Sequence, residues 1–403
     1  MNRLILIFRT KIWALVLCQT KKQGLAVWAL APIPTHLTVP STVANAQTAN
    51  SAPPIYHIEK ALGAFRLAAT LKLMIPFALA LVLQTTCWGQ STPPSAATDQ
   101  LILVIGAGGD EKYAREFSQW GDAWKILAEH QYWPLTLIDG SSQEHATSRI
   151  QLQTALSELV DADRLAANRA DSSSRLWIVL IGHGTAVGDN AKFNMVGPDI
   201  SAQELSAWVE PLSCPLVIVN CSSASAPFLP ELSGPQRMVI TATRSASELN
   251  YSRFGKYLAQ SLEDLSGDID HDLEVSLLEA FLAAVARTEQ FYRDDARLTT
   301  EHALLDDNGD DRGTSSDFFR GLQHIKAGEK GEAVDGALAA RVILFSSADA
   351  PQLTPAQEQQ RQSIEEQLDA LRSKKSLLDD ADYYQRLERL LLDLAKVYDA
   401  AEC

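Results

Sequence analysis

Residues 176–184 read LWIVLIGHG, and residues 216–224 read LVIVNCSSA. Each segment is an unbroken apolar run, typical of a strand buried on both faces, and each ends directly in small residues around His183 or Cys221. From about residue 100 onward, other short apolar runs alternate with amphipathic stretches, which is the pattern of strands alternating with helices. The sequence therefore predicts an α/β fold with an open, mostly parallel sheet flanked by helices.

The spacing of apolar residues also predicts where the individual elements lie. Besides the two runs above, strands are expected at Leu101–Ile105, Leu135–Ile138, Met238–Ala242 and Arg341–Phe345. Helices are expected at Glu111–His130, Glu144–Val160, Ser201–Val209, Tyr251–Leu265 and Val275–Tyr292. Ser201 and Glu204 have the spacing of a capping box, which supports a helix start at that point.

Composition divides the chain into three parts. Residues 1–97 read as a leader, because Lys72 precedes the apolar segment Leu73–Cys87 and small polar residues follow, as in a secretory signal. One hypothesis is that translation starts near Met74, so that residues 1–73 result from a start-site error, and the alternative is a long, poorly structured leader. Residues 98–350 are expected to form the α/β domain. Residues 351–403 carry apolar residues at helical spacing, which predicts a helical hairpin, a coiled coil or a solvated helical tail.

The leader and the composition suggest where the protein works and what it meets. A signal segment predicts a secreted, periplasmic or cell-envelope protein whose membrane contact is confined to the N-terminal segment. The formal net charge is −15, from 50 acidic and 35 basic residues, which argues against binding to nucleic acid. The C-terminal helices are a candidate surface for self-association. Five scattered cysteines form no disulfide framework and leave room for one reactive thiol.

His183 and Cys221 are the candidate catalytic pair. They follow two apolar runs and lie 38 residues apart, about one strand–helix–strand unit, so they are expected at the same edge of the sheet. An imidazole beside a thiol can take its proton and make it a nucleophile. The backbone N–H groups of Gly184 and Cys221 are candidates for an oxyanion hole. No third residue that would orient His183 is identifiable. The structural alternatives are a small core cysteine and an ordinary loop histidine.

The segments LWIVLIGHGT, LVIVNCSSAS and MVITATRSASELNYSRFGKYLAQSL together resemble the caspase-like clan of cysteine peptidases, in particular its legumain-type members. The resemblance covers residues 101–314. It implies a caspase-like fold and a cysteine endopeptidase that cleaves peptide or protein substrates through an acyl-enzyme thioester, with no cofactor required for the chemistry. By resemblance, His183 is the general base and proton donor, Cys221 is the nucleophile, and Gly184 and Cys221 supply the oxyanion hole. A transpeptidase or transamidase would use the same pair.

The chain departs from that clan just before the cysteine. Val219-Asn220 stands where legumains and caspases have Glu-Ala or Gln-Ala, so an asparagine preference is not carried over. The residues expected nearest the substrate are Asn220, Thr243, Arg244 and Ser245. If Arg244 lines the pocket, an acidic residue would be preferred before the scissile bond.

A candidate calcium loop runs from Asp268 to Glu279. Its spacing is that of an EF-hand loop, with ligands expected from Asp268, Asp270, Asp272, Glu274 (through its backbone carbonyl), Ser276 and Glu279. Leu273 occupies the position where glycine normally makes the sharp turn, which would weaken or distort the site. The alternative is an acidic helix N-terminus without an ion.

Two other functions stay open at this point. One is a catalytically inactive relative that acts as a calcium-dependent binding or scaffold protein. The other is a membrane-tethered interaction protein built around the C-terminal helices. Selective reactivity of Cys221 separates the enzyme from both.

Overall fold

The structure is a computed structural model that describes residues 98–140, 147–166, 174–188, 190–328 and 333–400. The expectations about the leader, its signal segment and Met74 concern residues outside these ranges. Among the described residues, no helix is long and apolar enough to cross a membrane.

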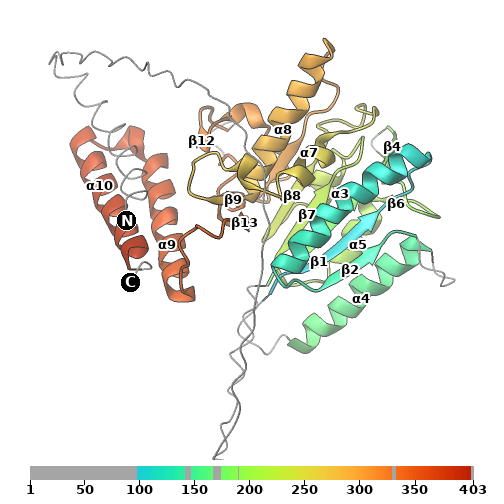
Figure 1. The fold of residues 1–403 in the computed structure, drawn as a ribbon, viewed down its shortest axis with the longest axis horizontal. Helices are drawn as coiled ribbons and strands as arrows, with labels where there is room; N and C mark the ends of the chain where they lie inside the picture. Colours follow the sequence, from blue (N-terminus) through green and yellow to red (C-terminus); the bar gives the residue numbers. More distant parts are fainter. Residues whose placement is uncertain (1–97, 141–146, 167–173, 189, 329–332, 401–403) are drawn as a thin grey trace, which may run out of the picture. The chain divides into compact units, whose positions relative to one another are not determined.

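A six-stranded sheet forms the centre of the α/β domain, in the order β10-β8-β7-β3-β1-β2. Its strands are β1 (Gln100–Ile105), β2 (Leu135–Ile138), β3 (Leu176–Ile181), β7 (Leu216–Asn220), β8 (Arg237–Thr241) and β10 (Leu304–Asp306). Figure 1 labels β1, β2, β7 and β8 of this sheet. All neighbours pair in parallel except β10, which runs antiparallel to β8 at one edge. Every residue of β3 and β7 is buried, as their unbroken apolar sequences predict. The predicted mostly parallel α/β fold is confirmed.

Helices cover both faces of this sheet. One face packs against α3 (Glu111–His130), α7 (Phe254–Gln260) and α8 (Leu277–Asp294), and the other against α4 (Ser148–Ala166), α5 (Ala202–Val209) and α6 (Phe228–Leu232). Side chains of β1 alternate between the two cores, because successive residues of a strand point to opposite faces. The predicted capping box of α5 is present, with Ser201 as the N-cap and Glu204 bonded back to it.

Several element boundaries differ from the prediction. Thr147 is not helical, so α4 begins at Ser148, and it continues to Ala166, beyond the expected Val160. α7 is shorter at both ends than Tyr251–Leu265. The expected final strand, β13 (Ile343–Ser346), pairs antiparallel with β9 (Glu274–Ser276), so it lies outside the central sheet. The smaller elements are β4 (Gly184–Val187), β5 (Asn190–Phe193), β6 (Ile200–Ser201), β11 (Phe319–Arg320), β12 (Gln323–His324), η1 (Leu265–Gly267), η2 (Ser316–Phe318), η4 (Ala339–Arg341) and η5 (Lys375–Leu377).

The C-terminal segment is a pair of helices, α9 (Pro355–Ser373) and α10 (Asp380–Asp399), which confirms the predicted hairpin. Ile364, Leu368 and Val397 form a small apolar cluster between them. The buried Arg361 of α9 pairs with Glu274 of β9 at 2.5 Å, which connects the hairpin to the α/β domain. Self-association through these helices stays a prediction.

Two buried carboxylates hold the chain after β10. Asp307 accepts backbone hydrogen bonds from Gly336, Leu338 and Ala339, and Asp335 accepts them from Asp307 and Asn308. The Thr314 hydroxyl donates to the other oxygen of Asp335. Burial raises the pKa of Asp335 to about 7, because its effect is larger than that of these hydrogen bonds, which lower the pKa. These carboxylates therefore have a structural role.

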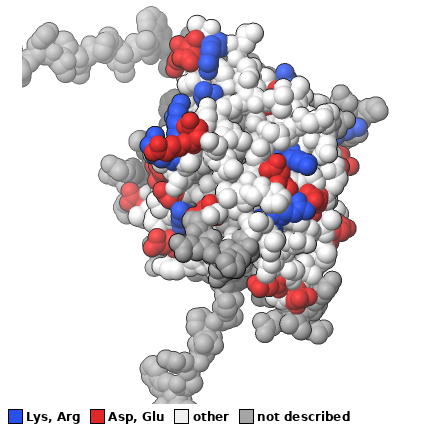
Figure 2. All heavy atoms as spheres, turned by 90° about the vertical axis from the view of Figure 1, so that its right-hand side faces the viewer, with Lys and Arg blue, Asp and Glu red and all other residues white. Residues whose placement is uncertain are grey.

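The charged side chains do not gather into one continuous area on the face drawn in Figure 2, which shows basic and acidic groups side by side with uncharged areas between them. Charges of opposite sign on this face therefore offset one another locally, although the whole chain is acidic.

Candidate active site

The loops after β3 and β7 meet at the carboxyl edge of the sheet. The two strands pair in parallel as far as Leu180 and Asn220, and the next N–H, that of Cys221, donates to the Leu180 carbonyl at 2.9 Å. Beyond the strands, the Ser223 hydroxyl donates to the Gly184 carbonyl at 3.1 Å, and Gly184 N lies 3.3 Å from the same hydroxyl. A Cβ at position 184 would lie 2.0 Å from the Ser223 carbonyl oxygen, so the two loops fit together only with glycine there. The predicted meeting of the histidine and cysteine loops is therefore what the structure shows.

His183 lies among aromatic rings from two other segments. Its ring centre is 5.0 Å from those of Tyr113 and Phe117 on α3 and 5.9 Å from that of Tyr251. Burial lowers the pKa of His183, and a hydrogen bond to the backbone of Gly108 opposes that effect. This hydrogen bond favours the protonated ring, so a ring N–H of His183 donates it and the backbone carbonyl of Gly108 accepts it. The bond holds the ring in one orientation. The lowered pKa favours a neutral imidazole at neutral pH, the form that can take a proton.

Cys221 is buried on the face of the sheet that packs against α3, α7 and α8. It is only 1% exposed and belongs to the hydrophobic core of that face. The backbone of Gly255 at the start of α7 lies against it, because a Cβ there would be 2.7 Å from Cys221 Cβ and 3.1 Å from its Sγ. Burial raises the pKa of the Cys221 thiol to about 12. The thiol is thus neutral and covered in this conformation.

The expected oxyanion hole is not formed in this structure. The Cys221 N–H continues the sheet ladder to the Leu180 carbonyl, and the Gly184 N–H is directed to the Ser223 hydroxyl. Both N–H donors are therefore occupied within the protein, that of Cys221 by strand pairing and that of Gly184 by the cysteine loop. Of the two, Gly184 has the longer bond, 3.3 Å, to a hydroxyl group that can rotate.

The four residues expected nearest the substrate have unequal environments. Asn220 and Thr243 are fully buried; Asn220 accepts from Ser222, and Thr243 bonds with Ser225. Their side chains therefore stabilise the loops. The Ser245 hydroxyl bonds with its neighbour Ser247. The Arg244 guanidinium lies 3.5 Å from the Glu248 carboxylate. Its side chain is 60% exposed, so this charged group reaches solvent.

Sequence reasoning missed the groups that surround the pair. Tyr251 donates its hydroxyl proton to Glu116 of α3, and the buried Glu301 accepts hydrogen bonds from residues 252–254. His302 bonds with Glu248 at 2.6 Å. These residues come from separate parts of the chain and share no motif. Gly108 carried a signal, since a glycine run directly follows the first strand.

The acidic loop brings three of its six expected ligands together. Carboxylate oxygens of Asp268, Asp270 and Glu279 lie within 4.8 Å of one another, a separation that fits a cation. Leu273 has φ of 73°, so this residue adopts the left-handed turn that was expected to need glycine. Calcium binding by this loop stays a prediction.

Asp272 and Ser276 use their side chains within the protein, and Glu274, which was expected to bind through its backbone carbonyl, has its carboxylate paired elsewhere. The Asp272 carboxylate accepts from Glu274 N, and the Glu274 carboxylate pairs with Arg361 and accepts from the Ser346 hydroxyl. The Ser276 hydroxyl caps α8 and donates to Glu279. The grouped carboxylates therefore number three, and Ser276 serves as a helix cap in this structure.

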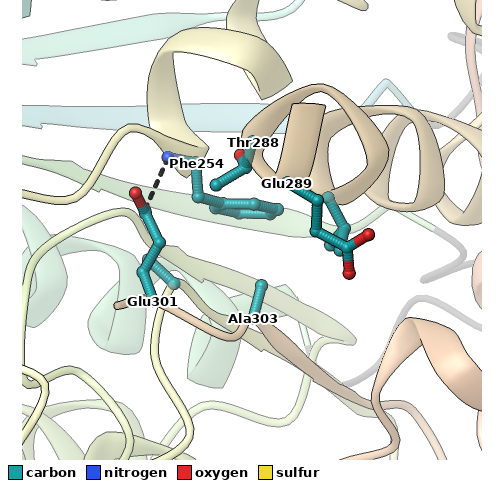
Figure 3. Close-up of a pocket in the computed structure, with 7 residues that line it drawn as sticks. Phe254, Thr288, Glu289, Glu301 and Ala303 are labelled. Carbon is teal, nitrogen blue, oxygen red and sulfur yellow. Dashed lines mark hydrogen bonds between the residues drawn. The ribbon is translucent and has the colours of Figure 1, made fainter. Parts of the chain in front are cut away.

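A small cavity of about 10 Å³ lies beside the segment that covers Cys221. It is lined by Ala242, Phe254, Val285, Thr288, Glu289, Glu301 and Ala303. Figure 3 shows Glu301 reaching toward the backbone of Phe254. A space of this size holds at most about one water molecule, so it is too small to be a substrate site.

No protein-family model matches the chain, and no curated protein matches it either. The crystal structure of protein GSU0716 from Geobacter sulfurreducens is similar over 52% of this chain and 92% of that chain, with 12% identity and a TM-score of 0.34. The crystal structure of Chaetomium thermophilum Raptor is similar over 42% of this chain and 18% of that chain, with 10% identity and a TM-score of 0.27. Both TM-scores are too low to carry an argument about function.

Proposed function

We propose that this protein is a cysteine endopeptidase of the caspase-like type, in which His183 and Cys221 act on a peptide bond of a peptide or protein substrate. The observation that supports the proposal is the contact between the two loops at the carboxyl edge of neighbouring parallel strands, made through Gly184 and Ser223. Ligands of open α/β sheets bind at this edge.

The environment of His183 fits the role of general base. The neutral imidazole takes the proton from Cys221 Sγ as the sulfur attacks the scissile carbonyl carbon, and the C–N bond then breaks to leave a thioester. The same imidazolium returns the proton to the leaving amine. Water hydrolyses the thioester in a peptidase, whereas an acceptor amine would resolve it in a transpeptidase or transamidase. The backbone of Gly108 keeps the ring in place through these steps.

A second candidate is a catalytically inactive relative that binds partners, with or without calcium. It is favoured by the burial of Cys221 and by a thiol pKa of about 12, because a reactive cysteine normally has a depressed pKa and some exposure. The two candidates differ in whether Cys221 ever reacts under the control of His183.

The test is labelling of the full chain with a peptide acyloxymethyl ketone, mapped by mass spectrometry, with and without added calcium. We expect slow, selective labelling of Cys221 that falls at least about a hundredfold in His183→Ala, since general-base catalysis contributes about 10²–10⁴-fold. His130→Ala is the matched control, because His130 is exposed at the end of α3.

Labelling of Cys221 that is indifferent to His183 contradicts the peptidase. Absence of labelling, even in a variant whose Cys221 is exposed to solvent, does so as well and favours the inactive relative.

A further inference from the structure

Residues 251–255, the cover segment, lie over both members of the candidate pair. The ring of Tyr251 packs against His183 and against Tyr113, with centroids 5.9 and 4.7 Å apart. Four residues later, the backbone of Gly255 lies against Cys221. A substrate carbonyl cannot approach the thiol while Gly255 is in this position, because Cys221 is only 1% exposed.

One buried carboxylate holds the middle of the cover segment. Glu301 is 3% exposed, and its Oε2 accepts from the Ser252 hydroxyl at 2.7 Å, Arg253 N at 2.7 Å and Phe254 N at 3.0 Å (Figure 3). Its Oε1 accepts from the Tyr292 hydroxyl of α8 at 3.0 Å. Hydrogen bonds to a charged group are worth more than neutral ones, so this single side chain supplies most of the polar attachment of residues 252–254.

The flanks of the cover segment are attached separately. The Tyr251 hydroxyl donates to Glu116 of α3. His302, the neighbour of Glu301, bonds through its ring to Glu248, just before the cover segment. The irregular segment leading into β10 therefore holds the chain at two points. Residues 252–254 are hydrogen-bonded to this segment through Glu301, and the Arg253 guanidinium also lies 4.3 Å from the ring centre of Phe291 on α8.

We propose that the cover segment keeps the site latent and that Glu301 is the latch that holds it closed. This inference rests on the proposed function. Breaking the Glu301 bonds lets residues 252–255 move away from Cys221, which admits both water and a peptide to the thiol. Glu301 acts through the cover segment and never touches the substrate, so it is a positioning residue.

The first test measures the rate at which iodoacetamide modifies each cysteine of the folded full chain. Cys214 is the internal reference, because it is half-buried and belongs to the core on the other face of the sheet. We expect Cys221 to react far more slowly than Cys214 in the wild type. Glu301→Gln should raise the Cys221 rate at least about tenfold, because one neutral acceptor replaces a charge shared by three donors, and should leave the Cys214 rate unchanged.

Two further variants make the test specific. Ser252→Ala removes one of the three bonds to the cover segment and should raise the Cys221 rate severalfold, less than Glu301→Gln does. Glu204→Gln is the matched control, since it makes the same change in a carboxylate that caps α5 and pairs with Arg149 at 2.5 Å, on the opposite face. It should leave the ratio of the two cysteine rates unaltered. Hydrogen exchange of the Arg253 and Phe254 amides should accelerate in Glu301→Gln and not in Glu204→Gln.

The outcomes separate the latch from the chemistry. A wild-type Cys221 that reacts as fast as Cys214 overturns the latch, as does a parallel rise of both cysteines in Glu301→Gln, which would mean general unfolding. Selective exposure of Cys221 without any dependence on His183 supports the latch and contradicts the peptidase. Labelling that depends on His183 but is equally fast in wild type and Glu301→Gln supports the peptidase and contradicts the latch.

Discussion

Replacing Gly184 with alanine tests whether the histidine and cysteine loops form one packed unit. The added Cβ would lie 2.0 Å from the Ser223 carbonyl oxygen and 2.8 Å from the Ser222 hydroxyl, whereas ordinary contact begins near 3.4 Å. The loops must therefore move apart by more than an ångström, which costs about 1–3 kcal/mol as overpacking. The two hydrogen bonds between Gly184 and Ser223 would be lost as well, at about 0.5–1.5 kcal/mol each.

We therefore expect Gly184→Ala to lower the free energy of unfolding by about 2–6 kcal/mol, measured by urea denaturation followed by circular dichroism. Gly188→Ala is the control: a Cβ there meets nothing within 4 Å, and only its φ of 59° is unfavourable, at about 1–2 kcal/mol. Labelling of Cys221 by the peptide ketone should also fall in Gly184→Ala. If Gly184→Ala costs no more than Gly188→Ala, the close packing of the two loops is wrong.

Three further predictions concern other parts of the molecule. Burial raises the folded pKa of Asp335 to about 7, so the protonated carboxyl stabilises the fold fully below its ordinary pKa near 4, and this contribution is lost as the pH rises through 7. Wild-type stability, measured by urea titrations at each pH, should therefore fall between about pH 4 and 7, and the fall should be smaller in Asp335→Asn. Arg361→Met leaves the Glu274 carboxylate without its cation, so it should lower the free energy of unfolding by about 3 kcal/mol and speed the proteolytic release of residues 351–403. Arg372→Met removes an exposed ion pair with Asp369 and should cost under about 1 kcal/mol. Equal costs in the two variants would contradict a buried attachment. Arg244→Gln should remove a preference for acidic over basic residues before the scissile bond in peptide ketone labelling, and a wild-type preference for lysine would exclude that role.

The fold was largely predictable because the central strands are hydrophobic on both faces. Runs such as LWIVLI and LVIV identify buried strands by composition alone, and α3 matches its expected bounds at both ends. The antiparallel β10 was missed, because Leu304–Asp306 is too short to show a pattern. A strand was expected at Arg341–Phe345 and is present as β13, but its pairing with β9 was not predicted, since an apolar run does not reveal which strand it pairs with.

The meeting of the His183 and Cys221 loops followed from chain order, because consecutive parallel strands lie side by side and end at one edge. The acidic loop followed from its spacing, although Ser276 became a helix cap because a hydroxyl at that point is within reach of the Glu279 amide. The surroundings of the pair did not follow. Glu301, Glu116 and Tyr251 lie far apart in the sequence, and each is an unremarkable polar residue until the chain is folded.

The sequence by itself determined the α/β class, the helical hairpin and the two loops that carry His183 and Cys221, because these depend on local hydrophobic patterns and on the handedness of strand crossovers. Only the tertiary structure decided that Cys221 is covered, that Gly108 orients His183 and that Glu301 holds residues 252–254. Burial and hydrogen bonding between distant segments arise from packing, and packing brings together residues whose separation in the sequence carries no signal.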